Sequence, residues 1–105
     1  MEVNDEKIVS AIVIGCGQRG KNYSRYAQEY PHCLKIVGVA DPLKHRREKV
    51  AEMVGLKNPD LIVDDWKKLA EMPEKMADIA FITTQDQLHR DPAIAFAQKG
   101  TLKIF

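Results

Sequence analysis

The sequence predicts an α/β fold with a parallel, doubly wound sheet. Short runs of apolar, β-branched residues alternate with helical patterns along the chain, as they do in βαβ units. These runs are apolar almost throughout, which is typical of strands buried on both faces of a parallel sheet. A glycine-rich loop follows the first run directly. Such loops join a strand to a helix in doubly wound folds.

Length and composition limit the function classes. The chain has 105 residues, with 16 basic and 15 acidic side chains and a formal net charge of +1. This suits one domain, and it lacks the basic excess of a nucleic-acid binder. No apolar run is long enough for a membrane span, and the acidic start of the chain is unlike a secretory signal. Two cysteines make no disulfide framework. We therefore expect a cytoplasmic protein without nucleic-acid or membrane partners.

The first strand is predicted at residues 7–14 (KIVSAIVI). The helix after the glycine loop places Tyr23, Tyr26, Ala27 and Tyr30 on one stripe, because they recur at helical spacing. We expect this stripe to pack against the sheet. Pro31 then ends the helix.

The second strand is predicted at residues 35–40 and ends in an Asp-Pro turn. A second helical pattern follows, and Gly55 supplies its C-terminal stop. Residues 61–63 are predicted as a short third strand. Either Asp64 or Asp65 could cap the short helix that comes next.

The fourth strand is predicted at residues 77–83, followed by a polar loop. The last helix runs from about residue 89 to 99, with Ile94 and Ala97 expected on its buried face. Residues 101–105 would begin a fifth strand. Strands and helices in this order imply right-handed crossovers. The sequence thus predicts a Rossmann-type sheet that is incomplete at its C-terminal end.

The loop after the first strand has the full G-x-G-x-x-G pattern, with Gly15, Gly17 and Gly20. Gly15 allows a sharp turn off the strand, and Gly17 removes a Cβ so that a pyrophosphate can approach the backbone. Gly20 allows the helix to pack closely against the sheet. The free N–H groups in the first turn of the helix would then bind the phosphates. The pattern predicts a dinucleotide site.

Asp41 follows Gly20 by about 20 residues, at the end of the second strand. A carboxylate there can accept hydrogen bonds from the hydroxyls of an adenosine ribose, which favours NAD. Lys44, Arg46 and Arg47 follow it closely and could neutralise the 2′-phosphate of NADP. We therefore expect NAD and keep NADP as the alternative.

Two other interpretations of the loop remain open. It could be a tight turn without a ligand, since Asp-Pro is also a common turn signal. A methyltransferase uses a similar loop and acid, but its loop usually reads G-x-G-x-G. Arg19 takes the place of that last glycine here.

The loop and the fourth strand together resemble the Gfo/Idh/MocA family of NAD(P)-dependent oxidoreductases. The likeness extends over residues 8–100. The stretches that resemble the family are Ala11 to Gly20 (AIVIGCGQRG), Val37 to Pro42 (VGVADP), Asp64-Asp65-Trp66 with Leu69, and Ile82 to His89 (ITTQDQLH).

The resemblance implies that Thr83, Thr84 and His89 lie beside the nicotinamide end of the cofactor. The usual proline of that stretch is replaced by Gln85. The family's catalytic lysine belongs to a Glu-Lys-Pro motif after the fifth strand. Lys103 does not stand in such a motif, so we assign no catalytic residue and no metal ligand.

We expect residues 1–105 to form a partial NAD(P)-binding Rossmann domain with no second domain. By resemblance it would serve an oxidoreductase that transfers hydride to or from a sugar or polyol, and it would bind cofactor alone without catalysis. The alternatives are a non-catalytic dinucleotide-binding module or a truncated isoform acting through a partner. Self-association or a missing C-terminal substrate domain is expected. The predicted cofactor-binding residues are Gly15, Cys16, Gly17, Gln18, Arg19, Gly20, Asp41, Thr83, Thr84 and His89.

Overall fold

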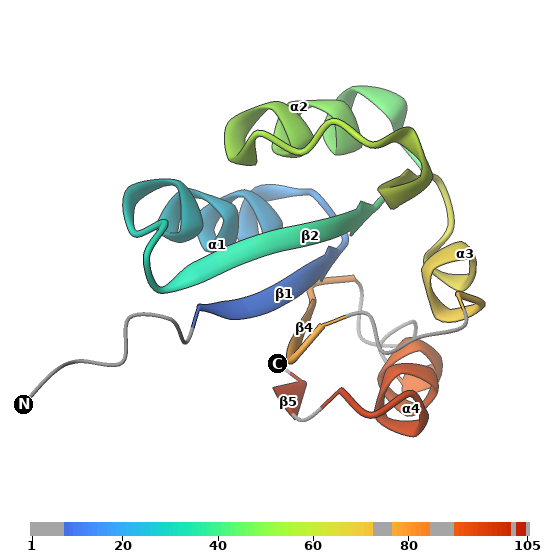
Figure 1. The fold of residues 1–105 in the computed structure, drawn as a ribbon. Helices are drawn as coiled ribbons and strands as arrows, with labels where there is room; N and C mark the ends of the chain where they lie inside the picture. The colour runs from blue at the N-terminus through green and yellow to red at the C-terminus, as the bar shows by residue number, and fades with distance from the viewer. Residues whose placement is uncertain (1–7, 73–76, 85–89, 102, 105) are drawn as a thin grey trace, which may run out of the picture.

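A computed structural model describes residues 8–72, 77–84, 90–101 and 103–104. In this part of the chain, five parallel strands form one sheet in the order β3-β2-β1-β4-β5 (Figure 1). This order confirms the doubly wound prediction, because the chain builds outward from β1 in both directions. The strands are β1 (Val9–Ile14), β2 (Leu34–Ala40), β3 (Ile62–Val63), β4 (Ile79–Ile82) and β5 (Lys103–Ile104).

Helices cover both faces of the sheet. Figure 1 shows α1 and α2 on one side of the strands and α3 and α4 on the other. Alternate residues of β1 serve two separate cores: Ala11 and Val13 pack on the first side, Ile12 and Ile14 on the second. Burial on both faces explains why the strand is almost continuously apolar. The helices are α1 (Gln18–Glu29), α2 (Lys44–Val54), α3 (Trp66–Ala70) and α4 (Arg90–Gln98), with a 3₁₀ turn η1 (Pro59–Leu61) before β3.

The buried face of α1 differs from the predicted tyrosine stripe. Tyr23 does stack on Phe81 of β4, with ring centroids 4.2 Å apart. Tyr26 and Tyr30 are about half exposed and contact each other instead. The prediction is therefore confirmed for Tyr23 and Ala27 and wrong for Tyr26 and Tyr30. The helix approaches the sheet closely, and small residues allow this approach. The fully buried positions of α1 are Gly20, Ser24 and Ala27.

The buried face of α4 also differs from the prediction. Ile94 is 45% exposed and Ala97 is exposed as well, so their predicted burial is wrong. Phe96 is fully buried and lies 6.1 Å from the Trp66 ring of α3, centroid to centroid. Phe96 therefore takes the buried face of α4, where its ring packs beside Trp66.

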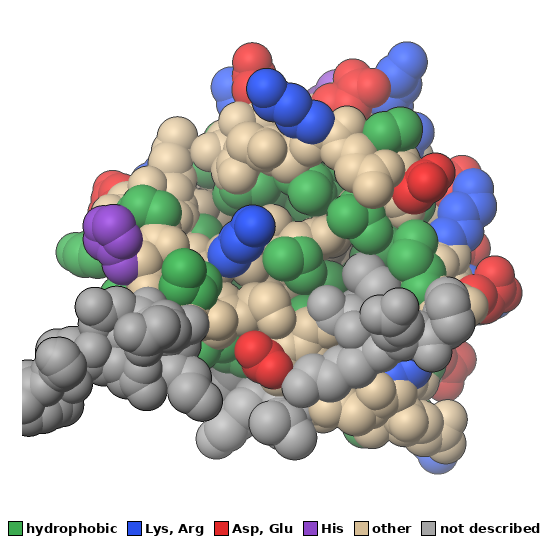
Figure 2. Space-filling view, viewed as in Figure 1, with side chains coloured by type: hydrophobic (Ala, Val, Ile, Leu, Met, Phe, Trp, Pro, Cys, Tyr) green, Lys and Arg blue, Asp and Glu red, His purple; other side chains and the backbone are tan. Residues whose placement is uncertain are grey.

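The predicted helix stop and cap are both present. Gly55 adopts a left-handed conformation (φ 73°) just after α2, and its N–H donates to carbonyls of that helix. Of the two candidate caps for α3, Asp65 takes the role, since its side chain accepts a hydrogen bond from the Lys67 N–H at 2.9 Å. Charged side chains of both signs gather over α2 (Figure 2). No helix in the described ranges is long and apolar enough to cross a membrane.

Candidate dinucleotide-binding site

The predicted site residues that the structure describes gather at the edge of the sheet where the parallel strands end. The glycine loop follows β1, Asp41 follows β2, and Thr83 follows β4. A hollow of about 510 Å³ opens at this edge, and Gly15, Asp41 and Thr84 line it. The sheet order reverses between β1 and β4, and open α/β sheets bind ligands at such a switch point.

Gly15 and Gly20 are required by the fold of the loop itself. Gly15 has φ +96°, and a Cβ there would lie 2.8 Å from Thr83 Oγ1. A Cβ on Gly20 would lie only 2.1 Å from the Gly15 carbonyl oxygen. Neither position has space for a side chain, whether or not a ligand is bound.

Gly17 is different, because nothing in the fold requires a glycine there. Its φ of −79° is open to any residue. A Cβ on Gly17 would meet only Arg46 Nη1, at an ordinary contact distance of 3.5 Å. The space above Gly17 therefore suits a pyrophosphate that approaches the backbone closely.

The first turn of α1 is suited to a phosphate. The first N–H groups of a helix have no acceptor within the helix. Gly17 is the N-cap, and it has no side chain that could accept from them. The first turn holds no acidic residue, and Arg19 is exposed there. A phosphate at this end would gain both hydrogen bonds and the favourable helix dipole.

Asp41 lies beside the loop, and its carboxylate is already hydrogen-bonded. The residue is only 5% exposed. Its Oδ2 accepts from the Cys16 N–H at 2.7 Å, and its Oδ1 accepts from the Leu43 N–H at 2.8 Å. Each carboxylate oxygen has a further lone pair for a ribose hydroxyl. Sequence reasoning missed both backbone contacts, since spacing alone does not reveal them.

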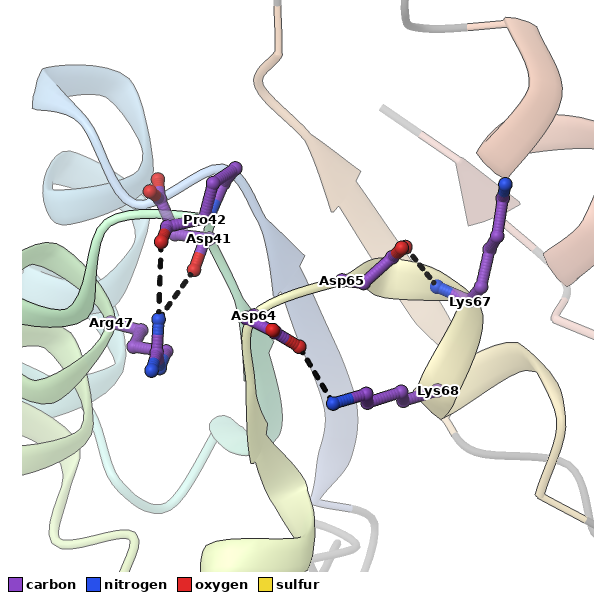
Figure 3. Close-up of polar contacts among 7 residues, drawn as sticks. All are labelled: Asp41, Pro42, Arg47, Asp64, Asp65, Lys67 and Lys68. Atoms are coloured by element: carbon purple, nitrogen blue, oxygen red, sulfur yellow. Dashed lines mark hydrogen bonds and ion pairs between the residues drawn. The ribbon is translucent and has the colours of Figure 1, made fainter.

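The three basic residues after Asp41 have different environments. The Arg47 guanidinium donates to the backbone carbonyls of Asp41 and Pro42, at 3.1 and 3.3 Å (Figure 3). Lys44 is exposed and lies 4.0 Å from Glu48. Arg46 is the one whose guanidinium reaches the loop, at Gly17.

Carboxylates also line the far side of the hollow. Asp64 and Asp65 follow β3, and Asp91 lies in the first turn of α4. Lys68 pairs with Asp64 at 2.9 Å and lowers the pKa of that carboxyl through its hydrogen bond and charge (Figure 3). Counting Asp41, four carboxylates and one lysine, Lys67, are among the described residues that line the hollow, so its lining carries a negative excess.

Two threonines follow β4 directly, and their hydroxyl groups differ in hydrogen bonding. Thr83 Oγ1 donates to the Gly15 carbonyl at 2.6 Å, so its proton is used within the protein. Thr84 Oγ1 is buried and has no hydrogen-bond partner among the described residues. A buried hydroxyl beside a hollow is a group that a ligand can satisfy. His89 lies outside the described residues.

Cys16 is a packing residue of the loop. Its side chain is fully buried, and Sγ lies 3.8 Å from the Ala40 carbonyl oxygen. Burial, and next the charge of Asp41, raise the pKa of the thiol to about 12. The thiol is thus protonated at neutral pH, which disfavours nucleophilic or redox chemistry. The described residues hold no group of three His, Cys, Asp or Glu side chains that could bind a metal ion.

Comparison with protein families identifies the chain. A family model described as "Oxidoreductase family, NAD-binding Rossmann fold" matches residues 9–105. The chain belongs to the Gfo/Idh/MocA oxidoreductase family. The match includes the glycine loop, Asp41 and the end of β4. This confirms the resemblance, the NAD-binding Rossmann fold and the cofactor class that the sequence predicted. None of the curated proteins matches the chain.

Solved structures share the fold. The WlbA dehydrogenase of Bordetella pertussis, crystallised with NADH and UDP-GlcNAcA, matches with a TM-score of 0.73 at 18% identity over 92% of this chain. The WlbA dehydrogenase of Chromobacterium violaceum matches with 0.67 at 20% identity over 93%. RSP, a Rex-family repressor, matches with 0.69 at 20% identity over 94%. The chain spans 28%, 26% and 44% of their lengths, respectively.

Proposed function

We propose that this chain binds NAD across the carboxyl ends of β1, β2 and β4. The pyrophosphate lies on the loop and the first turn of α1, and the adenosine ribose lies on Asp41. The nicotinamide lies near Thr83 and Thr84. The observation that carries this proposal is Gly17, which is a glycine at a position where neither its φ nor its neighbours require one. The hydroxyl of Thr84, which is buried and has no partner among the described residues, supports the position of the nicotinamide end.

We favour NAD over NADP for two reasons. Among the described residues, Asp41, Asp64 and Asp65 line the same hollow against a single lysine, Lys67, and their charges would repel a 2′-phosphate. Of the three basic residues after Asp41, Arg47 is occupied by backbone carbonyls, and Arg46 is the one that reaches Gly17. A single exposed arginine offsets little of that repulsion.

Titration of NADH and NADPH by nicotinamide fluorescence tests this choice. NADH is expected to bind at least about tenfold more tightly, a difference of about 1.4 kcal/mol. Arg46→Ala is expected to weaken NADPH more than NADH, because the arginine would be the main partner of the extra phosphate. Lys44→Ala is the matched control, since Lys44 faces Glu48 and not the loop. Tighter binding of NADPH by the unmodified protein would overturn the assignment.

We further propose that the whole protein is an oxidoreductase acting on a sugar or polyol by hydride transfer. Bound NAD would supply the hydride chemistry, and the protein would supply orientation and electrostatics. Two dehydrogenases of the same fold, crystallised with NADH and a nucleotide sugar, support this substrate class. Residues 1–105 would then be part of one Rossmann domain, with substrate contacts made by residues outside it.

An assay of residues 1–105 with sugars and polyols tests this division. NADH binding without turnover is expected, because residues 1–105 do not contain the family's Glu-Lys-Pro motif, whose lysine would assist proton transfer from the substrate hydroxyl. Turnover above background would contradict this division.

We also propose a cytoplasmic location, since free Cys16 and Cys33 suit a reducing compartment.

A further inference from the structure

Two side chains from different strands hold the glycine loop. On one side, the Asp41 carboxylate accepts the Cys16 N–H at 2.7 Å, and this hydrogen bond is buried. On the other side, the Thr83 hydroxyl donates to the Gly15 carbonyl at 2.6 Å. The loop is therefore bound through an N–H and a carbonyl of adjacent residues, from β2 and from β4.

The Asp41 side of this arrangement is rigid. The Asp41 N–H donates to the Val63 carbonyl of β3 at 3.0 Å. Its own carbonyl accepts from Arg47, and its second carboxylate oxygen accepts from the Leu43 N–H. The carboxylate that holds Cys16 is thus attached to two strands and to the start of α2.

The Thr83 side is equally constrained. The Thr83 N–H donates to the Ile14 carbonyl at 2.8 Å, which continues the pairing of β4 with β1. The hydroxyl then lies so close to Gly15 that a Cβ on this glycine would be 2.8 Å from it. The threonine hydroxyl and the missing side chain at Gly15 fit each other.

We propose that Asp41 and Thr83 are positioning residues that clamp the glycine loop in its ligand-ready shape before the dinucleotide arrives. The proposal rests on the proposed NAD site. A loop that is already ordered loses less conformational freedom on binding, so a larger part of the interaction energy appears as affinity. Asp41 thereby has a second role besides its contact with the ribose. Thr83 acts through the loop and not through direct contact with the cofactor.

Cys16 provides a reporter that needs no cofactor. Its thiol is buried beneath the loop, so alkylation requires the loop to open. In a Cys33→Ser background, which removes the exposed thiol, Thr83→Ala is expected to raise the alkylation rate of Cys16 about tenfold, as the loss of one hydrogen bond would. Thr83→Ser keeps the hydroxyl and is expected to restore the slow rate.

Thr101→Ala is the matched control. Thr101 is a buried threonine between α4 and β5, and its hydroxyl has no partner in the described part of the chain. The Thr101→Ala substitution should leave both the alkylation rate of Cys16 and the NADH affinity unchanged. An equal rate increase in Thr83→Ala and Thr101→Ala would show general loosening of the fold and overturn the clamp. An unchanged alkylation rate of Cys16 in Thr83→Ala would also overturn the clamp.

NADH affinity is the second measurement. Thr83→Ala should weaken NADH about tenfold, and Thr83→Ser should recover it. An unmodified protein that fails to bind NADH would refute the proposed function, while the Cys16 rates would still decide whether the clamp exists. A protein that binds NADH equally well with and without the Thr83 hydroxyl would refute the clamp alone.

Asp41→Asn carries the test if Thr83→Ala does not fold. In the wild type, each of the two carboxylate oxygens accepts a hydrogen bond from a backbone N–H. Asparagine replaces one of these oxygens with an NH₂ group, which cannot accept, so one of the two hydrogen bonds is lost. The variant is expected to bind about tenfold more weakly than wild type to an NAD analogue that lacks the adenosine ribose hydroxyls. Equal binding of this analogue by both proteins would limit Asp41 to ribose recognition and refute its part in the clamp. Alkylation rates of Cys16 in this variant are divided by the fraction of thiolate before they are compared with wild type, because Asp41 also raises the pKa of Cys16.

Discussion

The three glycines of the loop are required for different reasons. Gly15 and Gly20 lack space for a Cβ within the protein, whereas Gly17 has it. Substitutions at these positions should therefore separate folding from binding. A side chain at a position that needs glycine for the fold lowers the stability of the protein. A side chain at a position that needs glycine for the ligand lowers only the affinity for that ligand.

Gly17→Val is expected to abolish detectable NADH binding with little loss of stability. The cost to folding should stay within about 1 kcal/mol, the range for replacing an N-cap glycine. Gly20→Ala is the contrasting variant, and it should lower the melting temperature strongly because its Cβ meets the Gly15 carbonyl. Calorimetric titration and thermal unfolding measure the two effects. Equal NADH binding by wild type and Gly17→Val would contradict the site.

The Cys16 thiol should make stability depend on alkaline pH. Burial raises its pKa from the ordinary value of 9.0 to about 12, so the folded state holds the proton more tightly than the unfolded state. This contribution is fully present below pH 9 and is lost as pH rises toward 12. The melting temperature should fall less steeply across this range in Cys16→Ala than in wild type. Cys33→Ala is the control, and identical slopes in all three proteins would disprove the burial effect.

The helices take their orientation from tertiary packing. Both α1 and α4 follow a helical pattern, yet α4 turns a different face to the sheet than the apolar periodicity indicates, and α1 packs only Tyr23 and Ala27 of its predicted stripe against it. In α1 the close approach to the sheet favours Ser24 and Ala27 over Tyr26. In α4 the space beside Trp66 is filled by Phe96. Periodicity identifies a helix well, but neighbouring elements decide which side it buries.

Phe96→Ala should destabilise the fold by about 3–5 kcal/mol, since it removes a fully buried aromatic side chain. Ile94→Ala, in the same helix, should change stability by no more than about 0.5 kcal/mol, as most surface substitutions do. Chemical denaturation of both variants measures the difference. Similar losses for the two would show that α4 packs as the sequence pattern indicated.

Cofactor binding and self-association act on the whole molecule. In the described part of the chain β3 lies at one edge of the sheet, and this strand has two residues. Short strands of this kind leave little edge for pairing, but an unpaired edge still attracts other chains. We expect weak self-association that is sensitive to protein concentration, and light scattering over a dilution series tests it. A mass independent of concentration would contradict it.

NADH should raise the melting temperature of residues 1–105. At a concentration 100 times its Kd, a ligand adds about 2.7 kcal/mol. For a domain of this size that corresponds to a shift on the order of 10 °C. Gly17→Val should show no shift at the same NADH concentration. A shift in that variant would mean that NADH stabilises the protein from another site.

Most of the fold could be predicted from the sequence because its signals are local. Apolar runs predicted β1, β2 and β4, and Gly55 predicted the end of α2. The loop glycines and Asp41 predicted the dinucleotide site through their spacing along the chain. These signals depend on backbone conformations and strand burial that neighbouring residues encode directly.

The contacts between elements could not be predicted in this way. Sequence gave no sign that Asp41 holds the Cys16 N–H or that the Thr83 hydroxyl holds the Gly15 carbonyl. Both hydrogen bonds join residues that are distant along the chain and meet only because β2 and β4 flank β1 in the sheet. The buried faces of α1 and α4 were settled in the same manner, by the volume available against the sheet. Local pattern is encoded residue by residue, whereas these contacts depend on which strands become neighbours.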